Sequence, residues 1–468
     1  MRRFAQYFLL CLVVLTGPVC ERLAFADRPI LARISYTRGV DAMNRERYDD
    51  AIELFNSAID DGYREESIYF QRGVCLESIG ELDKAIADFD LSIQQSPRSE
   101  NYFHRASCYV AAEDWPKAIT DYTSCLKHDS KNADAWYGWA FAHGQIEKFE
   151  EGIEGCTKTI ELDASRSEAF LLRGFFRNQI GKYEEAVADT TKTIELDAEL
   201  ADGYFQRACA LIELSQYEKA KTDLEQTLRL DNEHAEAWHR LSWTLAQLGD
   251  HNKALIGYKR AMAFDPENAY ILKNRGDSYG ALGKMEDAIT DYTSALNIEP
   301  NFAEAMHQRG WAFIELDTPQ RALNDFNQAV AIAPKYAEAY KARASLLVSH
   351  GKIEPALDDY DKTIELAPDD VEAINEAAWI RATCADGRFR DVTKAIQLAR
   401  SACEKTQWRE PVFLDTYAAA LAAGGEFTEA VKWQSRALEL SGGDLRPDLQ
   451  SRLRLYQQRT SYRESLRR

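Results

Sequence analysis

The sequence predicts an all-α fold, a solenoid of about twelve helix–turn–helix repeats closed by a C-terminal capping helix. Its first support is the heptapeptide AITDYTS, which occurs at residues 118–124 and again at 288–294, an offset of 170 residues or five times 34. The second is the string TKTIELD, which occurs at 157–163 and at 191–197, an offset of 34 residues. A fixed period of this length is typical of repeat architectures.

Small residues recur with the same period. When each repeat is aligned on the alanine of AITDYTS, the successive steps are 34, 33, seven of 34, 39 and 35 residues. A second small residue lies about twelve positions earlier in most repeats, an aromatic residue commonly lies four positions after the alanine, and prolines close several repeats. The aligned positions are Ala51, Ala85, Ala118, Gly152, Ala186, Ala220, Ala254, Ala288, Ala322, Ala356, Ala395 and Ala430.

Each repeat therefore reads as two amphipathic helices, whose small residues allow close approach while the aromatic residues fill the space between them. This pattern resembles the tetratricopeptide repeat family, which implies a right-handed superhelix with a concave surface lined by the first helices. We assign ten repeats to residues 32–370 and two divergent ones to 371–444. A capping helix with a basic tail is expected at 445–468. This tail contains seven arginines; a solvated cap is one interpretation and an anionic contact another.

The N-terminus predicts a secretory signal peptide at residues 1–26, followed by a short lead-in at 27–31. Two arginines precede an apolar run, and Ala24 and Ala26 supply the small residues that a signal peptidase reads. An uncleaved anchor would need about 20 apolar residues, and Cys20 lies in a poor lipoprotein motif. We therefore expect a bacterial exported protein, periplasmic or extracellular, without a transmembrane segment in the mature chain.

The formal net charge of −19 argues against binding to nucleic acid, which requires a cationic surface. A basic or amphipathic partner is favoured. Seven cysteines follow the signal peptide, an odd number that leaves at least one without an intramolecular partner. We expect buried thiols for most of them. Cys384 and Cys403 lie on consecutive predicted helices, so a disulfide between them is conceivable in an oxidising compartment.

An arginine just before the first small residue recurs together with an aspartate sixteen positions later. Two repeats lose both residues together, at Trp139/Gly155 and at Leu241/Gly257. Joint presence and joint loss predict a partly buried ion pair with a structural role. The pairs are Arg72/Asp88, Arg105/Asp121, Arg173/Asp189, Arg207/Asp223, Arg275/Asp291, Arg309/Asp325 and Arg343/Asp359.

Signals for catalysis are missing. The sequence contains no glycine-rich phosphate loop, HExxH or GxSxG motif, and no Cys/His spacing typical of zinc. The RGDS string at 275–278 uses repeat positions inside a predicted helix. We predict no enzyme activity, no catalytic residues, no metal and no cofactor.

A binding surface remains as the functional candidate, on the first helix of each repeat. The position three residues before the first small residue is aromatic or apolar in repeats 1–6 and basic or ambivalent in repeats 7–10; packing between repeats is the alternative role. The position four residues further on carries Phe141, Trp243, Asp277 or Trp311, among others. The candidate groove residues are Tyr36, Phe70, Phe103, Tyr137, Phe141, Phe205, His239, Trp243, Lys273, His307 and Lys341.

This surface suits an extended peptide or an amphipathic helix. The carboxylate clamp of some tetratricopeptide repeat proteins needs clustered Asn, Lys and Arg, and Lys273, Asn274 and Lys341 match it only in part. The sequence therefore predicts a non-catalytic protein-interaction scaffold that binds a peptide or protein. An exported binding protein for a glycan, stacked on the aromatic residues, is the alternative.

Overall fold

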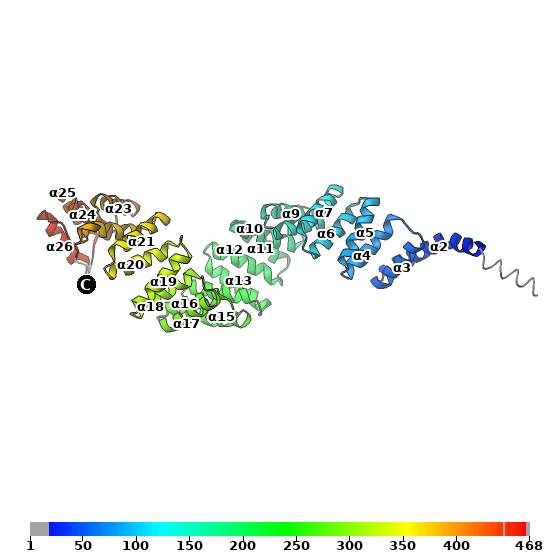
Figure 1. Ribbon diagram of the computed structural model, residues 1–468, viewed down its shortest axis with the longest axis horizontal. Helices are drawn as coiled ribbons and strands as arrows, with labels where there is room; N and C mark the ends of the chain where they lie inside the picture. The colour runs from blue at the N-terminus through cyan, green and yellow to red at the C-terminus, as the bar shows by residue number, and fades with distance from the viewer. Residues whose placement is uncertain (1–17, 443–444, 465–468) are drawn as a thin grey trace, which may run out of the picture. The chain divides into compact units, whose positions relative to one another are not determined.

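The computed structural model describes residues 18–442 and 445–464, with side chains from residue 28 onward. Residues 1–17 of the predicted signal peptide lie outside the described residues. Helices follow one another in chain order, and each packs beside the next within its repeat (Figure 1). The chain divides into two compact bodies, Met1–Ala237 and Trp238–Arg468, and the division falls inside one helix. Each body is described by itself.

The N-terminal body contains the helices of repeats 1–6. They are α2 (Pro18–Met43), α3 (Tyr48–Asp60), α4 (Glu66–Ser78), α5 (Leu82–Gln95), α6 (Ser99–Ala111), α7 (Trp115–His128), α8 (Ala133–Gln145), α9 (Phe149–Leu162), α10 (Ser167–Gln179), α11 (Tyr183–Leu196), α12 (Ala201–Glu213) and α13 (Tyr217–Leu230).

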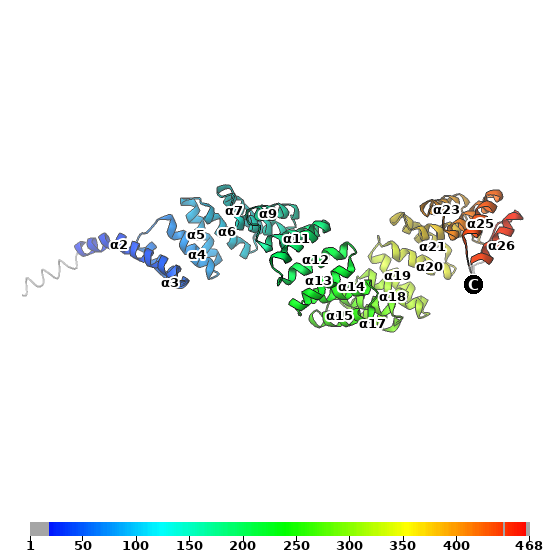
Figure 2. The same cartoon turned by 180° about the vertical axis from the view of Figure 1, so that it is seen from behind.

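The next helix, α14, spans the division, and the remaining helices lie in the C-terminal body (Figure 2). They are α14 (Ala235–Gln247), α15 (His251–Phe264), α16 (Ala269–Ala281), α17 (Met285–Ile298), α18 (Ala303–Glu315), α19 (Pro319–Ile332), α20 (Ala337–Ser349), α21 (Ile353–Leu366), α22 (Val371–Thr383), the 3₁₀ turn η1 (Gly387–Phe389), α23 (Val392–Lys405), α24 (Pro411–Ala423), α25 (Phe427–Leu440) and α26 (Leu445–Gln457).

The helix boundaries follow the sequence period closely. From repeat 4 onward, every first helix begins at the first residue assigned to its repeat, for example at Ala133 and at Ala303. The start of repeat 1 differs, because α2 begins at Pro18 and its helical backbone continues through the predicted lead-in at 27–31. Proline is favoured at the first helical position, because the N–H group that it lacks would have no hydrogen-bond partner within the helix there. The 34-residue period could not show this extension because it lies before the first repeat.

The small residues of the first helices face the aromatic residues of the second helices. A Cβ atom added at Gly73 would lie 2.8 Å from Phe89 Cε1, and one added at Gly310 would lie 2.5 Å from Phe326 Cε1. Both phenylalanine side chains are fully buried. Glycine is therefore required where the ring of the partner helix approaches the backbone, which confirms the role predicted for the recurring small and aromatic positions.

Repeat 11 has a longer connection between its helices than the other repeats. The segment between α22 and α23 contains η1, and Asp391 N donates to the carbonyl of Arg381 at 3.2 Å. Arg390 Nη1 donates to the carbonyl oxygens of Cys384 at 2.7 Å and Ala385 at 2.9 Å. The arginine thus fixes the path of the chain just after α22.

The capping helix α26 follows repeat 12. Its Leu449 and Tyr456 side chains are fully buried, Leu449 beside Leu414 and Tyr456 beside Ala418 of α24. The residues after α26 turn back toward repeat 11. Apart from an isolated parallel bridge between Cys384 and Glu464, no residue in the described ranges adopts β structure.

The seven cysteines with described side chains are free thiols, and all but Cys209 are buried in the helix packing. Cys384 and Cys403 are both free and buried, and they belong to different hydrophobic clusters. The disulfide that the sequence allowed between them is therefore not formed, because α22 and α23 direct the two thiols into separate parts of the core. Within the described residues, no helix has the length and apolar character needed to cross a membrane.

Candidate functional site

The structure brings all seven predicted arginine–aspartate pairs into contact between the two helices of a repeat. In repeat 9, Arg309 Nε donates to Asp325 Oδ2 at 2.8 Å and Nη2 donates to Oδ1 at 2.9 Å. The Asp325 side chain is only 2% exposed, so its charge depends on this two-pronged contact. Equivalent contacts join Arg72/Asp88, Arg105/Asp121, Arg173/Asp189, Arg207/Asp223, Arg275/Asp291 and Arg343/Asp359.

The pairs are partly buried, in agreement with the prediction. The arginine side chains are partly exposed and the aspartate side chains are buried. Each aspartate lies on a second helix and points into the joint with the first helix of its repeat, so the arginine covers it. The carboxylates are therefore out of reach of a partner and belong to the core, not to a binding surface. The buried aspartates are Asp88, Asp121, Asp189, Asp223, Asp291, Asp325 and Asp359.

Six of these seven arginines also reach the preceding repeat. Arg309 Nη1 donates to Thr293 Oγ1 at 3.1 Å, sixteen positions earlier in the chain. In repeat 8 the residue sixteen positions before Arg275 is Lys259, whose ammonium group has no acceptor to offer. This second partner was not predicted from the sequence, although a polar residue recurs at the required place. The other acceptors are Asn56, Asp90, Thr157, Thr191 and Asn327.

The two exceptions to the arginine–aspartate pattern have separate structural reasons. In repeat 4, Trp139 Nε1 donates to Thr123 Oγ1 at 3.1 Å, and a Cβ atom on Gly155 would lie 2.9 Å from Trp139 Cε3. In repeat 7, a Cβ atom on Gly257 would lie 2.2 Å from Ser242 Oγ. Each glycine therefore makes room for a side chain on the first helix, so an aspartate could not occupy its place.

The candidate aromatic residues of the N-terminal body are half-buried contacts between or within repeats. The Tyr36 ring stacks on Tyr63 with a centroid distance of 4.5 Å, and the ring centroids of Phe70 and His104 are 5.5 Å apart. The ring centroids of Phe103 and Tyr122 are 5.9 Å apart, and those of Phe141 and Trp115 are 6.1 Å apart. These rings fill the joints between helices, as the packing alternative predicted.

Residues that precede the next first helix cover two further aromatic candidates. The Arg166 guanidinium lies 4.3 Å from the Tyr137 ring centroid, and the His234 ring lies 4.5 Å from the Phe205 ring. In both pairs the covering residue follows the aromatic candidate by 29 positions. The same spacing joins His307 to Tyr336 and Lys341 to Asp370 in the C-terminal body. Packing by the next repeat thus limits the exposure of this column.

The two candidate lysines are neutralised within the chain. Lys273 Nζ lies 2.8 Å from Asp277 Oδ2, and Lys341 Nζ lies 2.7 Å from Asp370 Oδ2. The side chain of Asn274 is bonded to the His239 ring at 3.0 Å. The partial match to a carboxylate clamp is therefore occupied by internal contacts and presents no free cluster of donors.

His307 is buried on α18 and lies between Trp311 of the same helix and Tyr336, which precedes α20. Trp311 Nε1 donates to His307 Nε2 at 3.0 Å, so the neutral ring carries its proton on Nδ1, which donates to Tyr336 Oη at 3.1 Å. Burial lowers the pKa of His307 to about 4, with an additional contribution from Lys273. The imidazole is therefore neutral near pH 7 and holds the indole of Trp311 in place.

Trp311 is the exposed aromatic residue of this group and borders a hollow of about 370 Å³ between α16, α17 and α18. Its side chain is 39% exposed, and Trp243, one of the sequence candidates at the same repeat position, is half-buried. Asp277 and Glu315 also line the hollow. Apolar atoms of Met285 and Ala312 contribute to the walls. Asp277 pairs with Lys273 and accepts a hydrogen bond from Tyr292 Oη at 2.8 Å, so Glu315 is the carboxylate that the hollow offers. An aromatic face beside this carboxylate suits an amphipathic cationic group.

Comparison with known proteins gives the family. A tetratricopeptide repeat model matches residues 36–100, 205–269 and 307–371, and a second tetratricopeptide repeat model matches residues 269–302. The Hsp70-Hsp90 organizing protein of Triticum aestivum and the Hsp70-Hsp90 organizing protein 3 of Arabidopsis thaliana are each 24% identical to this chain over 125 residues. That match covers 26% of this chain and 22% of each relative.

Among solved structures, the chain is similar to yeast Tom70, with 16% identity, coverage of 92% of this chain and 96% of that chain, and a TM-score of 0.41. The matched segments overlap the paired helices of the described structure, and repeats of this family mediate protein–protein interaction. The paired helices, their 34-residue period and the family matches together show that this chain is a tetratricopeptide repeat protein.

Proposed function

We propose that this chain is a non-catalytic interaction scaffold that binds a basic or amphipathic peptide segment of a protein partner. The observation that carries the proposal is the hollow beside Trp311, where a fixed indole shares the lining with the exposed Glu315. A lysine or arginine side chain would place its charge near Glu315, because Asp277 already pairs with Lys273, and its methylene groups against the indole.

The electrostatics of the chain support the same partner. Acidic residues exceed basic ones by nineteen, which favours encounter with a cationic segment. The candidate lysines do not oppose this because each is already paired with a carboxylate. A few side chains in a partly enclosed site supply most of the affinity in such interfaces, so Trp311 is the residue whose loss should matter most.

The experiment uses two fluorescein-labelled twelve-residue peptides, one of alternating leucine and lysine pairs and one in which glutamate replaces every lysine. We expect the lysine peptide to bind the full chain and the glutamate peptide to bind at least about tenfold more weakly. Trp311→Ala should weaken binding of the lysine peptide by a factor of about ten or more.

Ile256→Ala is the matched control, because Ile256 is an apolar side chain of the same body that is 65% exposed and lies away from the hollow. It should leave the affinity for the lysine peptide unchanged. Equal binding of the two peptides, or equal affinity of the Trp311→Ala and Ile256→Ala variants for the lysine peptide, would refute the proposal.

We also propose that the protein is exported and loses residues 1–26. The support is the order of basic, apolar and small residues at the N-terminus. Mass spectrometry of the protein from its native envelope fraction should find Asp27 as the first residue, whereas a chain that retains residues 1–26 would contradict this.

A further inference from the structure

The residues after the capping helix, 458–464, lie against the ends of two first helices. Glu464 N donates to the carbonyl of Thr383 at 2.9 Å, and Arg463 Nη1 donates to the carbonyl of Ala382 at 3.1 Å, both at the end of α22. Ser461 Oγ donates to the carbonyl of Ala422 at 2.7 Å, at the end of α24. The last carbonyls of a helix have no N–H partner within it, so residues 458–464, the tail, supply donors to the carbonyls of Ala382 and Thr383. The carbonyl of Ala422 also accepts from Gly425 N at 3.1 Å.

A tryptophan on α22 receives the side chains of this tail. Trp379 Nε1 donates to Glu464 Oε2 at 2.5 Å, and its ring centroid lies 5.7 Å from that of Tyr462. Trp379 follows Trp311 by two periods of 34 residues, so both occupy the same place in their repeats. The tail thus covers, in repeat 11, the position that is open to solvent in repeat 9.

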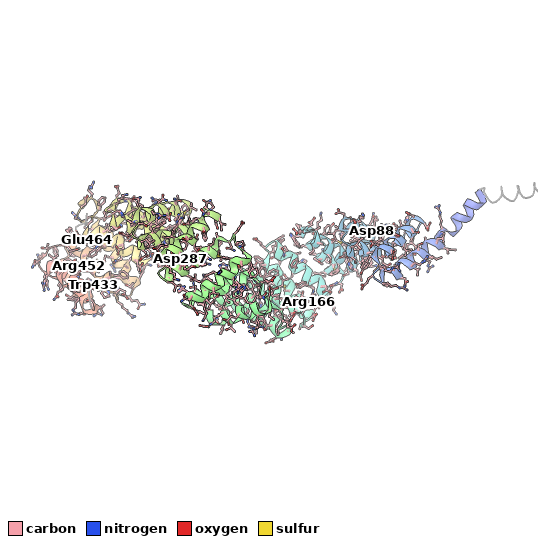
Figure 3. The ribbon with its side chains drawn as sticks, turned by 90° about the horizontal axis from the view of Figure 1, so that it is seen from below. Asp88, Arg166, Asp287, Trp433, Arg452 and Glu464 are labelled. Carbon is pink, nitrogen blue, oxygen red and sulfur yellow. The ribbon has the colours of Figure 1, made fainter. Side chains whose placement is uncertain are left out.

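Arg452 of α26 connects the capping helix to this contact. Its guanidinium carbon lies 5.3 Å from the Trp379 ring centroid and 5.4 Å from that of Tyr462. Its Nε donates to Asp415 Oδ1 at 2.9 Å, which holds the guanidinium in place. Arg452 and Glu464 both mark this end of the C-terminal body (Figure 3). The arginine is supplied by the cap and would remain if the tail left.

The tail is attached differently from the helix that precedes it. No side chain among residues 458–464 is buried, whereas Leu449 and Tyr456 of α26 are 1% and 0% exposed. The tail is held by hydrogen bonds and ring contacts, and its half-buried Tyr462 packs at the edge of the cluster that contains Tyr456. The tail is therefore bound at the surface, as a peptide ligand would be, and is not part of the hydrophobic core.

A cavity of about 660 Å³ separates the tail from the helices of repeat 10. Ser349, Ile353 and Ile380 line it on the helix side, and Tyr462 and Glu464 line it on the tail side. The tail closes this space without filling it, so its departure would open the cavity together with the Trp379 ring.

We propose that residues 458–464 are an intramolecular ligand that covers a second peptide-docking surface, formed by α22 and Arg452. The partner that this surface fits is an extended protein segment with the chemistry of the tail, a tyrosine two positions before a glutamate. Its carboxylate takes the Trp379 N–H, its tyrosine packs on Arg452, and its backbone N–H pairs with the carbonyl of Thr383. This surface is separate from the Trp311 hollow, and it selects an acidic group where the hollow selects a basic one.

The test measures binding of a fluorescein-labelled peptide with the sequence of residues 458–464 and an amidated C-terminus. The full chain is compared with its Tyr462→Ala/Glu464→Ala variant, in which the tail can no longer compete. We expect the variant to bind the peptide at least about tenfold more tightly than the unaltered chain. Glu439→Ala, which removes an exposed carboxylate paired with Arg436, should leave peptide binding at the unaltered level.

Two further variants locate the binding. Trp379→Phe, added to the double variant, keeps a ring but removes the indole N–H, and should weaken peptide binding at least about tenfold; Trp311→Ala in the same background should not. Equal binding by the full chain and the double variant, or no effect of Trp379→Phe, would overturn the proposal. If circular dichroism shows that the double variant is unfolded, Glu464→Ala alone, which retains Tyr462, replaces it under the same criteria.

Discussion

Trp139 Nε1 on α8 donates a hydrogen bond to Thr123 Oγ1 on α7 at 3.1 Å. The tryptophan occupies the place of the arginine found in most repeats, and the threonine occupies the place of the acceptor that those arginines use in the preceding repeat. One N–H group therefore preserves the link between repeats 3 and 4 although the ion pair within repeat 4 is absent. Glycine is required at position 155 for tryptophan to replace arginine at position 139, since the side chain of any larger residue would contact the indole.

We predict that Gly155→Asp destabilises the protein by about 2 kcal/mol or more, because its Cβ atom would lie 2.8 Å from Ala140 Cβ and 2.9 Å from Trp139 Cε3. Adding Trp139→Arg should recover most of this loss by restoring the ion pair of the other repeats. Urea unfolding followed by circular dichroism measures both effects. Gly442→Ala is the control, since its Cβ atom would have no neighbour within 4 Å; a double variant no more stable than Gly155→Asp would contradict the prediction.

A double-mutant cycle should show strong coupling between Arg309 and Asp325. Removal of either partner leaves the other charge largely buried, so Arg309→Met and Asp325→Leu should each lower the free energy of unfolding by about 2 to 4 kcal/mol. The double variant should lose less than the sum of the two. Simple additivity in the same urea series would show that the pair contributes nothing beyond its separate side chains.

The pH dependence of stability should contain a contribution from His307. Burial lowers its pKa from the ordinary 6.5 to about 4, so between these values the unfolded chain binds a proton that the folded chain does not. Stability should therefore fall as the pH falls from 6.5 toward 4, and His307→Gln should reduce this fall by about 1 to 3 kcal/mol. Free energies of unfolding measured from pH 7 to pH 4.5 for both proteins test it; parallel curves would contradict the assignment.

The buried thiols should resist alkylation in the folded protein. Burial raises the pKa of Cys75 to about 11 and those of Cys108, Cys156 and Cys403 to about 12, so few thiolates form at pH 8. Iodoacetamide should modify these cysteines at least about a hundredfold more slowly in the native protein than in guanidinium chloride. In guanidinium chloride without a reductant, mass spectrometry should find Cys384 and Cys403 both alkylated; modification only after addition of dithiothreitol would reveal a disulfide.

The ion pairs could be predicted from the sequence because both partners lie in one repeat and are lost together. The near-complete burial of the aspartate side chains could not, since it depends on how closely the two helices pack. The same alignment could have revealed Thr293 as the second partner of Arg309, since its column is polar in most repeats. The exposure of the candidate groove residues was harder to predict. Tyr137 and Phe205 are covered by residues in connections that the helix pattern leaves undefined.

The contact between Trp379 and Glu464 could not be found from the sequence. The two residues are 85 positions apart, and the tail belongs to no repeat, so the 34-residue period carries no information about it. The longer connection of repeat 11 was visible in the sequence, but its effect depends on the path that Arg390 gives the backbone beside Cys384. The backbone path of an irregular segment is set by such individual contacts, which a periodic sequence pattern does not reveal.

The lysine at position 259 has a consequence for how the C-terminal body loses its structure. In a linear array, cooperativity depends on the free energy of each joint between neighbouring repeats. The joint between repeats 7 and 8 lacks the arginine-to-acceptor bond that fastens the joints on the N-terminal side of repeats 9 and 10. A hydrogen bond between Asn274 and His239 still crosses this joint. Under heat or mechanical load we therefore expect α15 and α16 to separate before the joints that precede repeats 9 and 10, because a single cation removes one fastening from this position of the array.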